Sequence, residues 1–331
     1  MTLGPGKAVM RTALVLLVLG ALGGLAAGCR LVEATPAPET TPQPLAPLPL
    51  ASGARLRVLA TTSIVADVVR AVGGERLEVT SLVPAGIDPH AFEPAPQDVR
   101  RVAEAQVVVE NGLGLEAFLQ TLLRNAAADA PVISLAEGIE PLPAGDHAAG
   151  TDEHGAWDPH LWLDPRNVLV WTHTLETSLA ALDPSGAADY AQRADAYRTE
   201  LEALDAELEA TFAAIPSERR VLVTDHEEFA YFARRYGFTV VGTVIPAPSA
   251  AAEPSARELA ALETAIRSLG VRAVFVSSVV SPLLARQVAD DTGVQLVSLF
   301  AHSLSAPGGP APTYLEMMRS NARLIAEALM R

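Results

Sequence analysis

The tripeptide Asp-Pro-His occurs twice in the 331-residue chain, ending at His90 and at His160. Proline fixes its own backbone φ angle and restricts the residue before it, so the following histidine is held in a narrow range of positions. This restriction is useful if the imidazole must meet something at a fixed point, and neutral imidazole is a ligand suited to zinc, copper, iron and nickel. Asp-Pro also opens ordinary turns and helices, so the two tripeptides alone leave both interpretations open.

Two further histidines stand just beyond predicted strands. His226 ends the β-rich segment 219–226, and His302 comes two residues after the segment 294–300. Ligands of open α/β sheets bind in the crevice beyond the carboxyl ends of the strands. Four histidines at loop positions can therefore converge on one cleft.

Alternating β-rich and amphipathic helical segments surround these histidines and predict βαβ units with mostly parallel sheets. The predicted strands fall into two groups of four, at 55–62, 76–83, 105–112 and 130–135, and at 219–226, 238–245, 272–278 and 294–299. Between the groups lies a helical stretch, 165–214, interrupted at 183–186. Its second piece would be roughly 40 Å long. We predict an α/β fold with an N-terminal lobe (55–184), a long rigid connecting helix (185–214) and a C-terminal lobe (215–331).

The first 54 residues predict export and attachment rather than a folded core. Residues 1–28 form a signal peptide pattern, with basic Lys7 and Arg11 before an apolar run that ends in small residues. Cys29 is the only cysteine, and "LAAGC" resembles the lipobox in which this residue is lipidated; an incidental cysteine after a plain signal peptide is the alternative. Residues 29–54 are rich in proline and predict an extended tether.

The net charge of −15, from 24 basic and 39 acidic residues, disfavours nucleic acid and anionic membrane surfaces as partners. It mildly favours cations. The balance is common among secreted proteins, so it narrows the class of partner without identifying one.

Several ordered motifs resemble the zinc/manganese-binding solute receptors of bacterial metal ABC transporters. They are "LATTSIVADVVRAVGG" (59–74), "LVPAGIDPHAFEPAPQDVRRVAEAQVVVENGLGLEAFL" (82–119), "DPHLWLDP" (158–165), "VLVTDHEEFAYFARRYGF" (221–238) and "SLFAHSLSAPGGPAPTYLEMMRSNARLI" (298–325). The resemblance implies metal ligands at His90, His160 and His226. At the fourth position the family usually has aspartate, and this chain has His302; Ser277 stands where glutamate is common.

The resemblance implies two α/β lobes joined by one long helix, with metal at their interface. It also implies a monomeric extracytoplasmic receptor, anchored by lipid at Cys29, that delivers Zn²⁺ to the membrane permease of an ABC importer and is not an enzyme. Imidazole ligands favour zinc, whereas manganese is better served by carboxylates and water. The alternatives are a receptor for Mn²⁺ or another divalent metal, an adhesin-type lipoprotein of the same family, and a zinc hydrolase. The hydrolase lacks support because "HEEFAY" (226–231) has no second histidine to complete H-E-x-x-H.

Residues near the four histidines carry secondary predictions. We expect at least one nearby acid to orient the imidazole N–H groups, the candidates being Asp88, Asp158, Glu227 and Glu228. His147 and His154 lie in a loop rich in Gly, Ala and acids (143–160) that either collects metal weakly or is an ordinary solvated loop.

Other residues are expected to be structural. We predict a structural or surface role for His173, packing roles for Trp157 and Trp162, turn or cap roles for Glu93 and Asp164, and core positions for Met317 and Met318.

Overall fold

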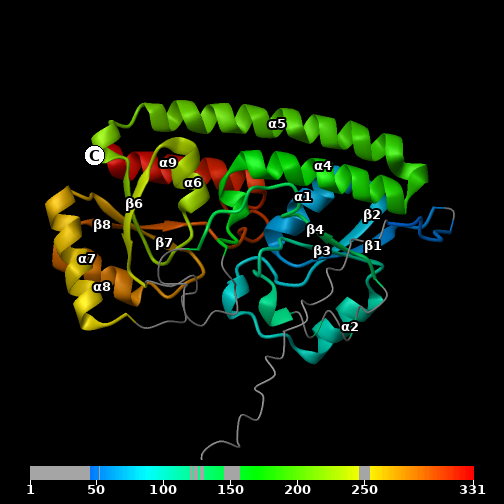
Figure 1. The fold of residues 1–331 in the computed structure, drawn as a ribbon, viewed down its shortest axis with the longest axis horizontal. Helices are drawn as coiled ribbons and strands as arrows, with labels where there is room; N and C mark the ends of the chain where they lie inside the picture. The colour runs from blue at the N-terminus through cyan, green and yellow to red at the C-terminus, as the bar shows by residue number, and fades with distance from the viewer. Residues whose placement is uncertain are drawn as a thin grey trace, which may run out of the picture. The chain divides into compact units, whose positions relative to one another are not determined.

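The computed structural model describes residues 45–331 except 52, 120–121, 123–125, 127–129, 145–156 and 246–253. Two four-stranded sheets, entirely parallel, lie within this part (Figure 1). The first has the order β2-β1-β3-β4, with bounds Leu56–Ala60 (β1), Leu77–Ser81 (β2), Val107–Glu110 (β3) and Val132–Ser134 (β4). The second has the order β6-β5-β7-β8, with bounds Val221–Thr224 (β5), Thr239–Thr243 (β6), Ala273–Ser277 (β7) and Gln295–Leu299 (β8). All eight predicted strands are confirmed, each within the predicted range.

Helices fill the gaps between strands, as predicted. Their bounds are Ser63–Gly73 (α1), Pro96–Glu104 (α2), Pro165–Leu182 (α4), Ala187–Ala213 (α5), Ala230–Tyr236 (α6), Ala256–Leu269 (α7), Leu283–Thr292 (α8) and Tyr314–Met330 (α9). None of the helices in the described ranges is both long and apolar enough to span a bilayer. The predicted signal peptide and Cys29 lie outside the described residues, as does most of the predicted tether.

Both sheets are covered on two faces, which explains why strands such as β7 are apolar and buried throughout. One hydrophobic cluster runs from β1 through α1, α4 and α5 to α9, and therefore includes elements from both predicted lobes. Smaller clusters lie on the opposite faces, one with Val102 of α2 and one with Leu262 and Ile266 of α7. The lobe boundaries stay a prediction, but the shared cluster connects the two sheets through the helical layer.

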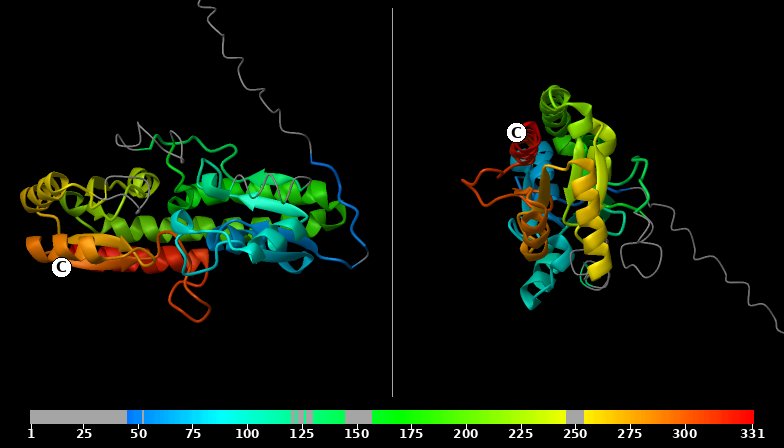
Figure 2. Two further views of the ribbon diagram at one scale, coloured as in Figure 1. Left: turned by 90° about the horizontal axis from the view of Figure 1, so that it is seen from below. Right: turned by 90° about the vertical axis from the view of Figure 1, so that its left-hand side faces the viewer.

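The helical layer begins as the sequence predicts. Asp164 caps α4 by accepting a hydrogen bond from the Arg166 N–H, and Pro165 occupies the first helical position. A short 3₁₀ turn, Pro184–Gly186, separates α4 from α5. The 27-residue α5 contains neither proline nor glycine, packs along α4, and contacts α1 and α9 (Figures 1 and 2). It extends alongside both sheets as an uninterrupted helix.

An ion-pair network centred on Asp205 joins α6 to α5. The Asp205 carboxylate of α5 accepts two hydrogen bonds from Arg235, at 2.9 and 2.6 Å, and one from the Tyr236 hydroxyl at 3.0 Å. Arg166 at the start of α4 donates a further bond at 3.2 Å. The side chains of Arg235 and Asp205 are 9% and 13% exposed, so the pair is largely removed from water.

Candidate metal centre

The two Asp-Pro-His tripeptides share one local hydrogen bond. In each, the aspartate Oδ1 accepts a hydrogen bond from the backbone N–H of the histidine two residues later, at 2.9 Å from Asp88 to His90 and 2.9 Å from Asp158 to His160. The carboxylate and the proline together fix the backbone at each histidine. The shared tripeptide is therefore a device that sets the direction of an imidazole, used once in each of two unrelated loops.

His226 and His302 follow the carboxyl ends of β5 and β8, where parallel sheets place their ligands. The Thr224 hydroxyl donates to the His226 carbonyl at 2.8 Å, which tightens the turn after β5. Asp225 ties that turn to the neighbouring strand, because its Oδ2 accepts the Ser277 N–H at 2.9 Å.

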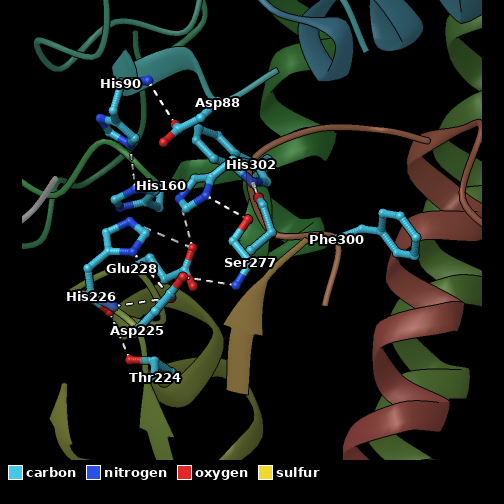
Figure 3. A network of polar contacts seen from close by, with 12 residues as sticks. Asp88, His90, His160, Thr224, Asp225, His226, Glu228, Ser277, Phe300 and His302 are labelled. Atoms are coloured by element: carbon cyan, nitrogen blue, oxygen red, sulfur yellow. Dashed lines mark hydrogen bonds and ion pairs between the residues drawn. The ribbon is translucent and has the colours of Figure 1, made fainter. Parts of the chain in front are cut away.

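All four predicted histidines meet at one place (Figure 3). One ring nitrogen or more from each of His90, His160, His226 and His302 lies within 4.8 Å of those of the others. The Nε2 atoms of His90 and His160 are 3.2 Å apart, and the rings of His226 and His302 stack with centroids 4.6 Å apart. Three of the rings are fully or almost fully buried, and His90 is half-buried. The structure shows that the four rings converge, whereas their role as metal ligands stays a prediction.

Three of the rings are oriented through Nδ1. The Nδ1 of His160 lies 2.7 Å from Asp158 Oδ1, and that of His226 lies 3.2 Å from Asp225 Oδ1. The Nδ1 of His302 is instead 3.0 Å from the Ser277 hydroxyl. Such contacts fix the tautomer and leave Nε2 for another partner.

Asp158 confirms the expectation that a nearby acid orients a ring, and Asp225 was missed. Asp225 directly precedes His226 at the end of a predicted strand. That position identified His226 as a candidate ligand and could have identified Asp225 as well. Glu228, another candidate acid, has its Oε2 2.8 Å from His302 Nε2 and 4.0 Å from His226 Nε2.

The electrostatics of these acids differ although they are neighbours. Burial raises the pKa of Glu228 well above its ordinary value, and the nearby Asp225 carboxylate raises it further. Burial also acts to raise the pKa of Asp225. This effect is outweighed by the contact with His226, by the nearby His302 and by the hydrogen bond from the Ser277 N–H, so the pKa of Asp225 is lowered. Burial raises the pKa of Asp158 to about 7 against the hydrogen bond from His160 N–H. Without a cation, Glu228 is therefore the acid of this group that most readily holds a proton.

Burial also keeps His302 neutral. Desolvation lowers the pKa of this imidazole, and the carboxylates of Asp88 and Asp225 only partly oppose the effect. A neutral imidazole retains a lone pair on one ring nitrogen, which a cation requires of a histidine ligand.

A second layer of buried groups holds the loop that carries His160. The side-chain amide of Asn111 donates to the Pro159 carbonyl at 2.9 Å and to the Gly112 carbonyl at 2.9 Å. Leu113, next to Gly112, has a φ of 54°, an unusual left-handed conformation for a residue with a side chain. The turn after β3 is thus a strained support that reaches across to the second Asp-Pro-His loop.

Glu116 holds that turn in place. Its carboxylate accepts hydrogen bonds from the Thr61 hydroxyl at 2.8 Å and from the backbone N–H groups of Asn111 and Gly112 at 2.8 and 3.1 Å. Burial, with the nearby Glu110 carboxyl, raises the pKa of Glu116 from 4.5 to about 7, although these three hydrogen bonds oppose it.

We expect the Glu116→Gln substitution to change how the free energy of unfolding depends on pH, because it removes the carboxyl group that binds this proton. The folded protein holds the Glu116 proton more tightly than the unfolded chain, so its stabilising contribution is complete below pH 4.5 and is lost as pH rises through about 7. The advantage of the wild type over the variant in free energy of unfolding should therefore shrink between pH 5 and pH 8, by up to about 3 kcal/mol. Urea unfolding of both metal-free proteins at several pH values measures the difference. An advantage that grows with pH contradicts the assignment.

Hydrogen bonds also join the loops that carry His90 and His302. The Ser303 hydroxyl accepts the Gly86 N–H at 2.8 Å and lies 3.2 Å from the Ser63 hydroxyl. Nearby, the Trp162 indole N–H donates to the Ala301 carbonyl at 2.6 Å. The four rings are thus presented by loops that are fastened to one another as well as to their own strands.

The remaining sequence predictions have mixed outcomes. Met317 and Met318 are buried as expected, and Trp162 packs edge-on to His160 with ring centroids 5.4 Å apart. Trp157 is 45% exposed and is only partly packed. His173 is exposed on α4, consistent with a surface role, and Glu93 is exposed in a loop. His147 and His154 lie outside the described residues.

The arrangement has the donor types and spacing of a transition-metal site. In tetrahedral zinc sites with bonds of about 2.1 Å, neighbouring donor atoms are ~3.4 Å apart. The pair formed by His90 and His160 has nearly this separation, and one nitrogen of each of the four rings lies within 4.8 Å of those of the others. Buried acids stand behind the rings, as outer-shell partners do in metal sites.

Comparisons with known proteins identify the family of this chain. Residues 58–328 match the family described as zinc-uptake complex component A, periplasmic. The manganese-binding lipoprotein MntA of Halalkalibacterium halodurans is 32% identical over 278 residues, covering 84% of this chain and 89% of that protein. The iron ABC transporter substrate-binding lipoprotein MtsA of Streptococcus pyogenes is 31% identical over 284 residues, covering 84% and 90%.

The solved structure of the periplasmic zinc-binding protein TroA from Treponema pallidum superimposes with a TM-score of 0.75 at 28% identity. The match covers 84% of this chain and all of that one. The two-sheet fold with its long helix is therefore that of a known metal-binding protein. Since the matching family model spans almost everything after the N-terminal segment, the chain belongs to the zinc-uptake complex component A family of extracytoplasmic metal-binding receptors of ABC transporters, which are not enzymes.

Proposed function

We propose that this receptor binds Zn²⁺ through His90, His160, His226 and His302 and delivers it to the permease of an ABC importer. The observation that carries the proposal is the approach of ring nitrogens from these four histidines to within 4.8 Å of one another. Imidazole nitrogen is a preferred ligand of zinc, and four such donors are enough to complete its tetrahedral shell.

Anchoring at Cys29 by lipid is part of the same proposal. The curated relatives MntA and MtsA are both named lipoproteins, which supports a tethered receptor. Mass spectrometry of the membrane fraction should find Cys29 acylated, and a Cys29→Ala protein should be released from the membrane. We further propose that the receptor acts as a monomer.

Mn²⁺ is the second candidate cargo, with Fe²⁺ beside it. The relatives named above are described as manganese-binding and iron-transporting, and a buried carboxylate, Glu228, lies against two of the rings. Carboxylate oxygen suits manganese better than imidazole does.

Titration of the metal-free protein with Zn²⁺, Mn²⁺ and Fe²⁺ in pairwise competition tests the choice of cargo. We expect one tight site per chain, with Zn²⁺ bound most strongly. A clear preference for Mn²⁺ over Zn²⁺ would replace zinc as the cargo. Failure of any of these ions to bind would reject the receptor function itself.

We also expect Zn²⁺ affinity to fall steeply as pH is lowered from 7.5 to 5.5. A protonated imidazole cannot ligate, so protons compete with the ion at every histidine donor. For each histidine that must lose a proton, the apparent dissociation constant rises by up to about tenfold per pH unit below the imidazole range. Competition against a chelator of known pH dependence measures the slope, and a pH-independent affinity contradicts histidine ligation.

Growth separates transport from an adhesive or structural role. Deleting the gene should impair growth only when zinc is limiting, and added zinc should restore it. A deletion strain that grows normally without zinc but attaches poorly to surfaces would favour the adhesin alternative.

A further inference from the structure

Glu228 differs from the other acids of the centre in the side from which it approaches the rings. Asp158 and Asp225 contact the Nδ1 atoms of their histidines. Glu228 instead contacts Nε2, at 2.8 Å in His302 and 4.0 Å in His226. Figure 3 shows its side chain between these two rings.

The opposite nitrogen of His302 already has a partner. Its Nδ1 lies 3.0 Å from the Ser277 hydroxyl, so Nε2 is the atom left for a cation. His226 is arranged in the same way, with Nδ1 against Asp225. Glu228 Oε2 therefore stands on the ion-facing side of both rings.

We propose that Glu228 binds the cargo ion directly, as a fifth donor beside the four imidazoles. The inference rests on the proposed function, since it assigns a further ligand to the same site. It gives the ion four nitrogen donors and one anionic oxygen donor.

The burial of Glu228 is the first physical argument. Its side chain is 1% exposed, and its Oε2 lies 2.8 Å from His302 Nε2, one of the atoms on which the ion would sit. An ionised carboxylate removed from water costs several kcal/mol unless an opposite charge stands beside it, and an ion close to Oε2 would supply that charge. The neighbouring Asp225 cannot take this place, because its two oxygens contact His226 and the Ser277 N–H.

Charge is the second argument. Four neutral imidazoles leave a divalent ion with its full double charge in a buried site, where uncompensated charge is costly. One carboxylate ligand halves that charge. The added oxygen donor also makes the site more suitable for Mn²⁺, an ion for which nitrogen-only sites are less well matched.

The test compares Glu228→Gln with Glu218→Gln, the same change at an exposed glutamate in the short 3₁₀ turn (Ser217–Arg219) that precedes β5. Metal-free wild type and both variants are titrated with Zn²⁺ and with Mn²⁺ against a competing chelator. We expect Glu228→Gln to weaken Mn²⁺ binding by about 100-fold or more, beyond the roughly 10–100-fold typical of orienting partners. Zn²⁺ binding should weaken by a smaller factor, because four imidazoles remain. Glu218→Gln should leave both affinities within about threefold of the wild type.

A role in orienting His302 predicts another pattern. Loss of an orienting partner would weaken Zn²⁺ and Mn²⁺ by the same factor, and that result would overturn the proposal. Unchanged affinity for both ions would overturn it as well. If the wild type itself binds neither ion, the proposed function fails, and this outcome is distinct from failure of the Glu228 assignment.

Two direct measurements do not depend on the variant folding well. The Co²⁺-loaded wild type should show the weak visible absorption of a five-coordinate ion rather than the stronger absorption of a tetrahedral one. A crystal structure of the Zn²⁺-loaded wild type should place a Glu228 oxygen about 2.0–2.2 Å from the metal. A Glu228 carboxylate that stays beyond bonding distance in that structure excludes the assignment.

Discussion

Replacing His160 with alanine is expected to weaken Zn²⁺ binding by more than about 100-fold while leaving the metal-free protein folded. Loss of the partners that merely orient a ligand costs roughly 10–100-fold in affinity, and His160 is proposed as the ligand itself. Its imidazole is fully buried and is oriented by both the backbone and the carboxylate of the Asp-Pro-His turn. Competition titration gives the affinity, and circular dichroism of the metal-free form checks the fold.

His173→Ala is the matched control for this substitution. It removes the same side chain from an exposed position on α4, so Zn²⁺ affinity should remain at the wild-type value. Equal losses in the two variants, or no loss in either, would mean that the four converging rings do not form the binding site. Combining His160→Ala with His226→Ala should abolish measurable binding.

Replacing Asp205 with alanine is expected to destabilise the protein by about 3 kcal/mol. Arg235 would remain largely buried with only the exposed Glu209 carboxylate, at 3.0 Å, as an anionic partner, and breaking a buried pair from one side typically costs about 3–5 kcal/mol. The same carboxylate also accepts hydrogen bonds from Tyr236 and Arg166, which would be lost together. Urea unfolding of the metal-free protein at pH 7 measures the change in free energy.

Glu207→Ala on the same helix provides the comparison. Glu207 pairs with Arg319 at 2.9 Å, but their side chains are 52% and 42% exposed. Exposed pairs contribute about 0.2–1 kcal/mol, so this variant should be nearly as stable as the wild type. Similar losses in both variants would contradict the view that burial gives the Asp205 network its strength.

The architecture was predictable because its signals are local and periodic. Strands buried on both faces appear as short apolar runs, and helices between them require parallel pairing. The helix start at Asp164-Pro165 and the break at 183–186 were readable from cap and turn residues. The strands are shorter than predicted because residues at their ends turn away into loops, as Asn111 does after β3.

The four histidines were predictable as a group, because the family resemblance and their positions beyond strands point to the same residues. The groups that position them were not. Ser303 and the Gly86 N–H, which it binds, are 217 residues apart, and Asp225 reaches Ser277 across 52 residues. No local pattern reports contacts at such separations.

The sequence also did not show from which side each acid approaches a histidine ring. Asp158, Asp225 and Glu228 are all acids next to histidines in sequence, yet two approach Nδ1 and one approaches Nε2. Which side of a ring an acid faces depends on how each loop turns after its strand, and that is set by tertiary contacts. The distinction between an orienting acid and a donor therefore required the structure.

The division of the four rings along the chain has a mechanical consequence. His90 and His160 precede α5, and His226 and His302 follow it, so an ion bound by all four would cross-link the halves on either side of that helix. Coordination bonds are only about 2.1 Å long, and a relative shift of one or two ångströms would leave the ion with half of its nitrogen donors. Binding and release of the cargo would then be coupled to one short displacement of these two halves.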